Sequence, residues 1–481
     1  MFSILLIGYS AVARRWEHEL FSRLKAAGHR VSVRLSDAAP PAARELDLVL
    51  GIEARRFGPS FAAAADPLVA TEVSDIALVI DLTGAAGAEA APVLTLEFAG
   101  EPNLSDGIVR LLASGQPAEL TVRLDGVAVG CARPMIGDRV WLGRGSNDLL
   151  SGAISLLEQS VARFAAGRLL PIDEAPKPAR RPVPGLLRSY LPSLTSGLVR
   201  RAIRKLRLGR RPFYWQVGYR LLDGPGIAET GRLDGVRFQT LPDDGDRFYA
   251  DPFAFAHLGH HFVFVEEFPY ATGRGVISVA ELGADGQFET PRVVLEEPHH
   301  LSYPQVFEHD GEIYMIPESS AAKELVLYRA APFPQRWVRD TVLVAGKEFN
   351  DATLLEQGGR FWLFGTQRCG GGSSSDTMAV YSAPSLHGPW TPHAMNPILI
   401  DQSAARPGGR FIEQGGKLLL PVQDGSKKYG GGLGLVQLTR LDDDDVVFSQ
   451  PEAVVPGAAW EHDGIHTLNR AGRLEVIDSS A

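Results

Sequence analysis

The sequence is poor in cysteine and contains no long apolar run. Its two cysteines, Cys131 and Cys369, lie far apart and form no Cys-x-x-Cys spacing, which predicts neither a disulfide framework nor a zinc site. No stretch approaches the roughly 20 apolar residues that a membrane-spanning helix needs, and the first residues lack the basic start of a signal peptide. These absences predict a cytoplasmic protein that meets membranes only at their surface.

Acidic residues are missing from one segment. The formal net charge of the chain is −9, which argues against nucleic acid as a partner of the whole protein. Residues 177–211, however, contain eleven Lys or Arg and no Asp or Glu, so the remainder has 37 basic and 57 acidic residues, a charge of −20. Over residues 198–211, apolar and basic residues interleave as in an amphipathic helix. This helix is expected either to hold the protein on an anionic inner-membrane surface or to be a linker that packs its apolar side and pairs its arginines with the acidic domains.

The pattern of apolar runs divides the chain into three segments. Residues 1–168 alternate short apolar runs with helical patterns, which predicts an α/β domain with a Rossmann-type, mostly parallel sheet. Its expected strands span residues 2–8, 30–35, 46–51, 77–81 and 93–98, and its expected helices span 16–27 and 146–168. Residues 169–212 form a basic, proline-rich linker and the amphipathic helix. In residues 213–481 related turns recur about every 50 residues, near 251, 304, 351, 407 and 464, which predicts an all-β, five-bladed β-propeller.

The first segment has no Gly-x-Gly-x-x-Gly sequence and therefore predicts no dinucleotide site. The order of its elements, with Gly84 and Gly100-Glu101-Pro102 after two strands, resembles the formyltransferase fold of methionyl-tRNA and sugar-nucleotide formyltransferases. That resemblance implies a catalytic Asn, His and Asp. The strand expected to carry Asn-x-His instead reads Leu94-Thr95-Leu96-Glu97-Phe98, and no histidine occurs between Val31 and Ala256. Because this chemistry needs an imidazole to move a proton, we expect a degenerate, scaffolding domain.

Several blocks of the third segment resemble one family in the same order. They are Ala250-Asp251-Pro252-Phe253, Leu301-Ser302-Tyr303-Pro304-Gln305-Val306-Phe307, Ile313-Tyr314-Met315-Ile316-Pro317-Glu318-Ser319, Gly388-Pro389-Trp390, and Arg406-Pro407-Gly408-Gly409 with Gln423-Asp424. Together they resemble the N-terminal propeller region of plant glucosamine inositolphosphorylceramide transferases and their bacterial relatives. The Asp-Pro-Phe start is more remotely similar to glycoside hydrolase families 43, 32 and 68. The resemblance implies a glycan, sugar nucleotide or glycolipid substrate. In the plant enzymes, however, the recognised transferase domain is a separate C-terminal unit.

One polar side chain per blade is expected to face the central funnel of such a propeller. The catalytic candidates are Asp251, Glu318 and Asp351, because glycoside chemistry needs one protonated and one ionised carboxyl group across a single bond. Crowding of carboxyl groups in a partly dry site pushes their pKa values apart and creates these two states. The substrate-binding candidates are Glu267, Tyr303, Arg406, Asp424, Asp463 and His466.

Each candidate also has a structural interpretation. An aspartate in a turn often caps backbone amides. Arg406 can hold a phosphate or carboxylate of a ligand, or it can form a buried salt bridge between blades. The histidine spacings match no zinc signature, so neither a metal nor another cofactor is expected.

Two main functions follow from these features. The first is an enzyme of envelope glycan or glycolipid biosynthesis, a glycosyltransferase or a glycoside hydrolase-like protein that uses the acidic residues of the funnel. The second is a non-catalytic glycan-binding partner of a separate glycosyltransferase. A sugar formyltransferase is the weakest alternative. A cytoplasmic location favours transfer or remodelling during biosynthesis over the breakdown of secreted polysaccharide. The sequence does not identify the sugar, the donor, the linkage or the oligomeric state.

Overall fold

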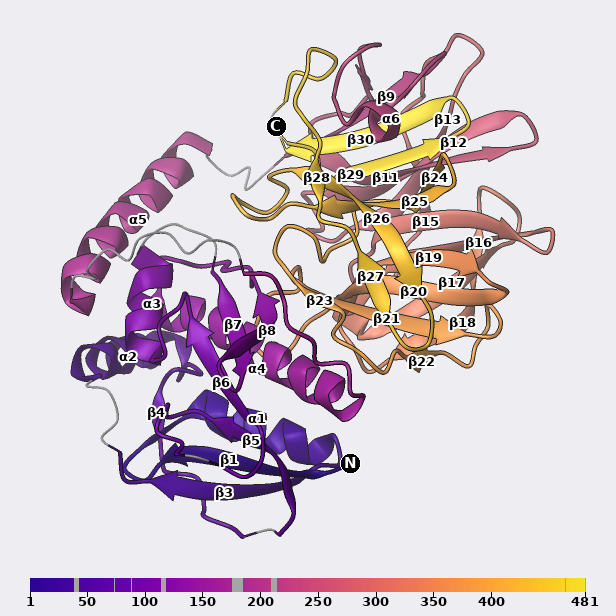
Figure 1. The fold of residues 1–481 in the computed structure, drawn as a ribbon. Coiled ribbons are helices and arrows are strands. Elements are labelled where there is room, and N and C mark those ends of the chain that lie inside the picture. Colours follow the sequence, from indigo (N-terminus) through magenta and orange to yellow (C-terminus); the bar gives the residue numbers. More distant parts are fainter. Residues whose placement is uncertain are drawn as a thin grey trace. The chain divides into compact units, whose positions relative to one another are not determined.

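The chain divides into two compact units in the computed structural model (Figure 1). The structure describes residues 1–38, 43–72, 74–87, 89–113, 118–174, 185–208, 214–462 and 464–480. The first unit comprises residues 1–207 with 369–373, and the second comprises residues 208–368 with 374–481.

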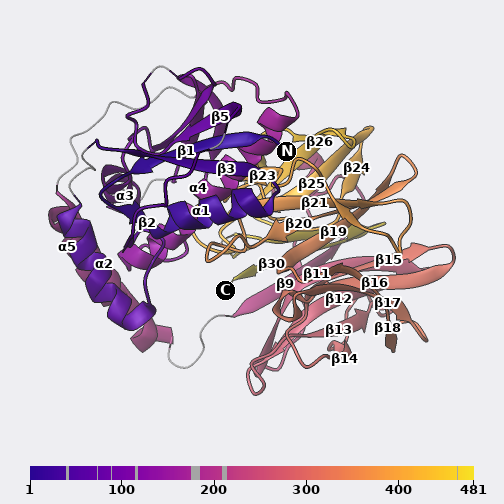
Figure 2. The ribbon, with the colours of Figure 1, turned by 90° about the horizontal axis from the view of Figure 1, so that it is seen from below.

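The first unit is built on a six-stranded sheet (Figure 1 and Figure 2). Its strand order is β3 (Arg30–Ser36), β1 (Ser3–Tyr9), β5 (Ile76–Asp81), β6 (Val93–Phe98), β7 (Leu120–Leu124) and β8 (Val127–Ala132). The first four strands in this order pair in parallel, whereas β7 is antiparallel to both of its neighbours. The helices are α1 (Arg15–Ala26), α2 (Arg44–Phe57), α3 (Leu104–Ala113), α4 (Leu142–Ala165) and α5 (Leu186–Leu208). A short ladder joins β2 (Ala13–Arg14) to β4 (Ala64–Ala65). The unit therefore has the predicted α/β class and a mostly parallel sheet.

One predicted strand of this unit is a helix. Residues 46–51 form a short apolar run, but they lie inside α2. The buried residues of α2 are Leu46, Val49, Leu50 and Glu53, whose spacing is that of one face of a helix. An apolar run this short fits a buried strand and a helix face equally well, so the prediction was wrong here.

Helix α5 carries the basic, amphipathic sequence. In its first half Leu186 and Tyr190 are buried, and the Tyr190 hydroxyl hydrogen-bonds the Glu53 carboxylate. In its second half Arg201 pairs with Asp138 at 2.6 Å. The second half also exposes four apolar side chains, those of Leu198, Val199, Ile203 and Leu206. Across the described residues, no helix combines the length and the apolar character needed to cross a bilayer. The ion pair of Arg201 with Asp138 agrees with a linker helix that pairs its arginines with an acidic domain. The exposed apolar side chains agree with a helix that binds a membrane surface.

The second unit consists of five antiparallel sheets and is the predicted five-bladed β-propeller. The first sheet contains β11 (Arg247–His257), β12 (His260–Pro269), β13 (Val276–Glu281) and β14 (Arg292–Leu295). The second contains β15 (Ser302–His309), β16 (Glu312–Glu318), β17 (Glu324–Ala330) and β18 (Trp337–Ala345). The third contains β19 (Phe349–Gln357), β20 (Arg360–Gln367), β21 (Thr377–Ala383) and β22 (Thr391–Pro392), with β23 (Leu399–Ile400) also pairing β21. The fourth contains β24 (Ile412–Gln414), β25 (Lys417–Gln423), β26 (Leu433–Leu441) and β27 (Val446–Phe448), with β28 (Glu452–Ala453) also pairing β26.

The fifth sheet combines the two ends of this unit. Its order is β10 (Gln239–Thr240), β9 (Trp215–Leu221), β30 (Leu474–Ser480) and β29 (Thr467–Ala471). The pairing of β9 with β30 closes the ring of blades, as propellers require. Two short helical segments, α6 (Ile227–Thr230) and a 3₁₀ turn (Ser320–Ala322), lie in connections.

Five apolar clusters hold the blades together, and each cluster joins two neighbouring sheets. Phe264 of β12, for example, packs in one cluster with Met315 of β16 and Tyr328 of β17. Both faces of most blades are therefore buried, so the inner strands do not alternate cleanly between apolar and polar residues.

Candidate site at the centre of the propeller

The first strands of the first three blades share a backbone irregularity. Asp251, Tyr303 and Asp351 adopt positive φ angles of 50°, 46° and 47°. Each lies where the pairing of its strand with the next strand shifts register. A bulge of this kind re-aims a side chain. A non-glycine residue in this conformation costs about 1–3 kcal/mol, and such strain gathers at functional sites. The recurrence seen in the sequence is therefore a repeated bulge that turns one side chain per blade.

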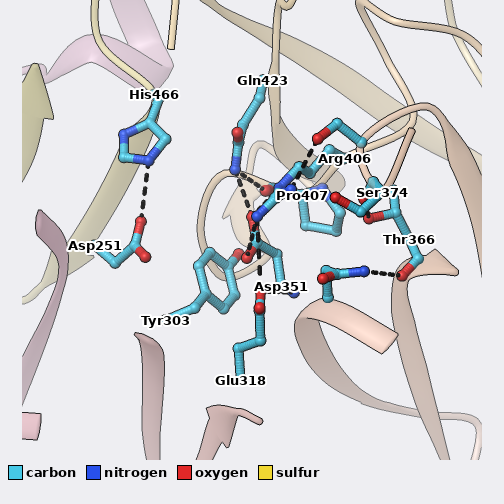
Figure 3. Close-up of polar contacts among 12 residues, drawn as sticks. Asp251, Tyr303, Glu318, Asp351, Thr366, Ser374, Arg406, Pro407, Gln423 and His466 are labelled. Atoms are coloured by element: carbon cyan, nitrogen blue, oxygen red, sulfur yellow. Dashed lines mark hydrogen bonds and ion pairs between the residues drawn. The ribbon is translucent and has the colours of Figure 1, made fainter. Parts of the chain in front are cut away.

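Asp351 and Arg406 form a bidentate ion pair (Figure 3). Arg406 Nε donates to Asp351 Oδ2 at 2.6 Å and Arg406 Nη2 donates to Oδ1 at 3.1 Å. Gln423 Nε2 donates to the same Oδ2 at 2.5 Å and to the Pro407 carbonyl at 2.9 Å. Glu318 Oε2 accepts the backbone N–H of Asp351 at 3.1 Å and lies 3.6 Å from Arg406 Nη2. Two predicted catalytic residues thus meet one predicted binding residue.

Asp251, the third predicted catalytic residue, lies beside His466. His466 Nε2 is 3.2 Å from Asp251 Oδ1, and His466 Nδ1 is 2.7 Å from Asp478 Oδ1. Asp478 also accepts the Thr467 backbone N–H at 2.9 Å, the Thr467 hydroxyl at 2.8 Å and the backbone N–H of Asp251 at 2.8 Å. Figure 3 shows Asp251 and His466 next to the group around Asp351. The imidazole is held between two buried carboxyl groups and connects the fifth blade to the first.

Glu266 joins this group, although the sequence analysis selected its neighbour. Burial raises the pKa of Glu266 well above its ordinary value, and the nearby Asp251 and Glu318 carboxylates raise it further. His300 Nε2 lies 3.3 Å from one oxygen of Glu266. Glu266 therefore supplies the carboxyl group of β12 that faces the predicted catalytic residues.

Glu267 lies on the opposite face of β12, because successive side chains of a strand alternate between its two faces. Its carboxylate accepts the Ser278 hydroxyl at 2.6 Å and pairs with Arg247. These contacts give Glu267 a structural role within its own blade, away from the group around Asp251.

Tyr303 is fully buried and supports the backbone near the site. Its hydroxyl lies 2.9 Å from Thr353 Oγ1 and accepts the Gly409 backbone N–H at 2.6 Å. Its ring packs edge-on against Phe253 at 4.8 Å between centroids. Because the ring and the hydroxyl are both occupied, Tyr303 holds three blades in register and leaves no face for stacking on a sugar.

A further predicted binding residue, Asp424, falls outside the group. Asp424 accepts the Ser426 backbone N–H at 2.9 Å and so caps the turn after β25, which is the structural use foreseen for aspartates in turns. The residue before it, Gln423, is the one that reaches Asp351. Asp463 lies outside the described residues.

We call eight of these residues the central cluster. They are Asp251, Glu266, Glu318, Asp351, Arg406, Gln423, His466 and Asp478, and all are less than a tenth exposed. Five carboxyl groups thus share a buried region with one guanidinium and one imidazole. An isolated buried charge is very costly, so a surplus of carboxyl groups is expected to keep protons.

The pKa shifts follow this charge balance. Burial raises the pKa of Asp351 to about 7 despite the opposing effect of Arg406. Burial also raises the pKa of Asp251, against the effect of His466. Burial alone would lower the pKa of His466, but Asp478 and Asp251 together raise it to about 10. Near neutral pH the cluster therefore contains a charged imidazolium together with protonated and ionised carboxyl groups, which are the two states that acid–base catalysis needs.

Asp251, His466 and Asp478 also lie close enough together to be considered for a metal ion, with potential ligand atoms within 4.8 Å of one another. A histidine that binds a metal ion does so as a neutral imidazole. The Asp478 and Asp251 carboxylates raise the pKa of His466 to about 10, and the ring lies between them as an ion pair in this structure.

The part of the chain that carries the central cluster matches known sequences. Residues 240–469 match the family model described as Glucosamine inositolphosphorylceramide transferase 1, N-terminal. The chain is 37% identical over 198 residues to Glucosamine inositolphosphorylceramide transferase 1 of Oryza sativa subsp. japonica, an alignment that covers 40% of this chain and 26% of the relative. It is 33% identical over 202 residues to the Arabidopsis thaliana protein of the same name, covering 41% of this chain and 26% of the relative. The chain therefore matches about a quarter of the length of these relatives.

Glycoside hydrolases are among the solved structures to which this chain is similar. An exo-β-1,3-galactanase variant from Phanerochaete chrysosporium is 12% identical with a TM-score of 0.35, over 44% of this chain and 53% of that chain. A thermostable family-43 glycoside hydrolase is 12% identical with a TM-score of 0.35, over 45% of this chain and 77% of that chain.

Proposed function

We propose that this protein is a carbohydrate-active enzyme of envelope glycan or glycolipid biosynthesis, which transfers or remodels a sugar at the central cluster. One observation carries the proposal: five buried carboxyl groups, one guanidinium and one imidazolium converge where the inner strands of the blades begin. All of these residues except Asp478 lie within residues 240–469, which match the family model of the plant transferases. The names of these relatives make a phosphoinositol-bearing lipid the substrate class of first choice.

Each residue of the cluster has a distinct role in this proposal. Asp251, whose pKa is raised by burial, is the proton donor to the leaving oxygen. Glu318 and Asp351 supply the carboxyl groups that activate the acceptor or attack the sugar carbon. Arg406 and Gln423 hold Asp351 in one orientation, and Arg406 is placed to hold a phosphate when Asp351 takes up a proton. His466 keeps a positive charge next to Asp251.

The test uses the full chain with inositolphosphorylceramide and a panel of UDP-sugars and lipid-linked sugars. Mass spectrometry is expected to show the lipid with one added sugar. Asp251→Asn and Glu318→Gln should lower this activity at least about 100-fold, the usual size of an acid–base contribution. Asp443→Asn, a change of an exposed aspartate in the same unit, should leave the activity intact. Unaltered turnover in both cluster variants would contradict the assignment.

The second candidate is a glycan-binding partner without catalysis. The observation that favours it is the bidentate bond between Arg406 and Asp351, which has the form of a structural salt bridge between two blades. In that case glycolipid binding measured by calorimetry persists without turnover. The Asp251 and Glu318 variants then change affinity and produce no difference in product.

For the first unit we propose a formyltransferase-like fold that no longer transfers formyl groups. The absence of a histidine between Val31 and Ala256 supports this reading, because no imidazole of this segment is available to move the proton. Incubation with a folate formyl donor and an amino sugar is expected to give no formylated product. Formation of that product would restore the formyltransferase alternative.

We further propose that the protein is cytoplasmic and binds the anionic surface of the inner membrane through residues 198–211. The basic charge of this segment and the exposed apolar side chains of α5 support this role. Its test by vesicle binding is given in the Discussion.

A further inference from the structure

A loop of the fourth blade begins directly after a member of the central cluster. It comprises residues 424–432, between β25 and β26, and follows Gln423. The backbone N–H of Asp424 donates to the Gly432 carbonyl at 2.8 Å, and the N–H of Gly431 donates to the Lys428 carbonyl at 3.0 Å. These two bonds close the loop on itself, so its backbone is held next to Gln423.

Tyr429 of this loop contacts two members of the central cluster. The Arg406 guanidinium lies over its ring, 5.5 Å from the ring centroid. The ring also meets that of His466 edge to face, at 5.9 Å between centroids. Arg406 and His466 are only 8% and 2% exposed, whereas Tyr429 is 48% exposed. Tyr429 therefore extends an aromatic surface from the buried cluster to the solvent, where a ligand can meet it.

The hydroxyl of Tyr429 lies near the predicted catalytic residues. Partial burial raises its pKa above the ordinary value, and the Arg406 guanidinium opposes this shift. The carboxyl groups of Asp351, Asp251 and Glu318 raise the pKa further. Because the effect of a charge weakens with distance, these three groups and the tyrosine share one region. A ligand that contacts the ring of Tyr429 is therefore within reach of the acids that are proposed to act on it.

The next residue, Gly430, fixes the place of the tyrosine. Its φ angle is 64°, and a Cβ atom at this position would lie 2.2 Å from the Trp215 ring. The buried Trp215 packs on the ring of His466 at 4.2 Å between centroids and meets the ring of Tyr429 edge to face at 6.2 Å. The tyrosine is thus held by its neighbours before any ligand arrives, which reduces the entropy lost on binding.

The surroundings of the ring indicate the chemistry of its ligand. The carboxyl groups of the central cluster accept hydrogen bonds and so suit a ligand with several hydroxyl donors. A pyranose ring carries such donors around its edge, and its C–H groups give it an apolar face that packs on an aromatic ring. A nucleobase also has an apolar face but offers fewer donors. The combination of a half-exposed tyrosine with several acids therefore fits a sugar best.

We propose that Tyr429 packs against the face of the sugar ring whose hydroxyl groups are bound by the central cluster. This role rests on the sugar chemistry proposed above and adds the residue that contacts the substrate from the side of the solvent. The contact forms on binding and needs no turnover, so it can be tested separately from catalysis.

The test is saturation-transfer NMR on the full chain, perdeuterated except for its tyrosines, so that magnetisation reaches a ligand only from tyrosine rings. The probes are the methyl glycosides of glucose, galactose and mannose. Sorbitol has the hydroxyl groups without a ring, and uridine tests the nucleobase alternative. Transfer to the C–H protons of at least one glycoside is expected, with much weaker transfer to sorbitol and uridine.

Two variants and one control assign the signal to Tyr429. Tyr429→Ala should weaken glycoside binding about tenfold or more, because the aromatic surface is lost. Tyr429→Phe, with its phenylalanines deuterated, should bind glycosides as the parent does but lose the transfer. Lys427→Ala changes an exposed residue of the same loop and should keep both binding and transfer. Melting temperatures check that all three variants are folded.

The proposal is overturned if no glycoside receives magnetisation at millimolar concentration, or if sorbitol or uridine receives it as strongly as the glycosides. Unaltered glycoside binding in Tyr429→Ala, or transfer that persists in Tyr429→Phe, would overturn it as well. The transfer assay described above judges the proposed function separately. Turnover with an unchanged KM in Tyr429→Ala contradicts the tyrosine contact and leaves the enzyme intact. Loss of glycoside binding in Tyr429→Ala, in a protein without turnover, supports the contact and favours the glycan-binding function.

Discussion

In the propeller, Arg406 is bonded to both oxygens of Asp351 and His466 lies between two carboxyl groups. In the first unit, Trp16 Nε1 and Glu17 Oε2 are buried without a hydrogen-bond partner among the described residues. α5 of the same unit exposes apolar side chains next to a row of basic residues. The central cluster of the propeller thus pairs its charged groups with one another, whereas α5 of the first unit turns apolar and basic side chains to solvent. We therefore expect substitutions in the central cluster to alter stability most, and substitutions of exposed residues of the first unit to alter binding.

The largest effect on stability is expected from breaking the internal pair of the propeller. Asp351→Asn removes the bidentate partner of the buried Arg406 guanidinium and leaves it only the Glu318 carboxylate, 3.6 Å away, which is expected to cost about 3–5 kcal/mol. The double variant Asp351→Asn with Arg406→Gln should recover most of this loss, because both charges are then removed. Urea denaturation measures both changes.

The exposed pair of Arg360 and Asp443 in the same unit is the matched control. Asp443→Asn should cost at most about 1 kcal/mol, since solvent screens an exposed pair. If Asp351→Asn is as mild as Asp443→Asn, the central cluster is not internally balanced and the contrast between the two units fails.

The next largest effect concerns the outward-facing helix. Changing Arg200, Arg201, Arg204 and Lys205 together to Gln should weaken binding to vesicles that contain phosphatidylglycerol or cardiolipin. Each basic residue near an anionic surface contributes about 1 kcal/mol, so the four together contribute roughly 4 kcal/mol. Vesicle flotation at low and high salt measures this, and binding should fall as the Debye length drops below about 10 Å.

The control neutralises four basic residues of the propeller, Arg232, Arg237, Lys427 and Lys428, and should leave flotation unchanged. A parent protein that stays in the soluble fraction at low salt, together with a lowered melting temperature of the α5 variant, would instead identify α5 as a linker helix.

The sequence predicted the propeller because its signal is a repeat. The turns near Asp251, Tyr303 and Asp351 recur because each of the first three blades begins with the same bulged strand, and a recurring bulge constrains the sequence strongly. The apolar run at residues 46–51 had no such context, and its i, i+3, i+4 spacing within α2 became clear only in the structure.

The individual residues of the central cluster were harder to predict from the sequence than the position of the cluster in the fold. Glu266 and Glu267 are adjacent, as are Gln423 and Asp424, and in both pairs the sequence analysis chose the neighbour of the residue that reaches the cluster. Strand alternation decides such a choice only when one face is polar. Here Val263 and Phe264 are both fully buried on opposite faces of β12, so alternation carries no signal. Asp478, in the apolar sequence Val476-Ile477-Asp478, was detectable as an acid within a buried strand.

A further effect on stability is expected from pH. The pKa of His466 is raised to about 10 in the folded propeller, whereas an unfolded histidine titrates near about 6.5. The folded state therefore keeps a proton that the unfolded state releases between these pH values. The stabilisation is complete below pH of about 6.5 and is lost as pH rises towards 10, by at most about 1.4 kcal/mol per pH unit.

His466→Gln should remove this slope in urea denaturation measured between pH 6.5 and 10. His393→Gln, which changes a histidine buried elsewhere in the propeller, should keep it. Equal slopes in the parent and in His466→Gln would show that the imidazole is not held as a cation.

The smallest effect on stability is expected at Glu266. Comparing it with its neighbour Glu267 distinguishes a buried acid with a raised pKa from a carboxylate held in an ion pair. Burial raises the pKa of Glu266 well above its ordinary value, so Glu266→Gln, which puts a neutral amide of the same shape in place of the carboxyl group, should change the free energy of unfolding by less than about 1 kcal/mol. Glu267→Gln removes the charge that pairs with Arg247 and should cost about 1–3 kcal/mol. Activity should respond in the opposite order, with the larger loss in Glu266→Gln, because only Glu266 is coupled to Asp251 and Glu318. If Glu266→Gln unfolds more easily than Glu267→Gln, Glu266 is ionised and paired in the native state. The proton for acid catalysis would then have to be carried by another residue of the central cluster.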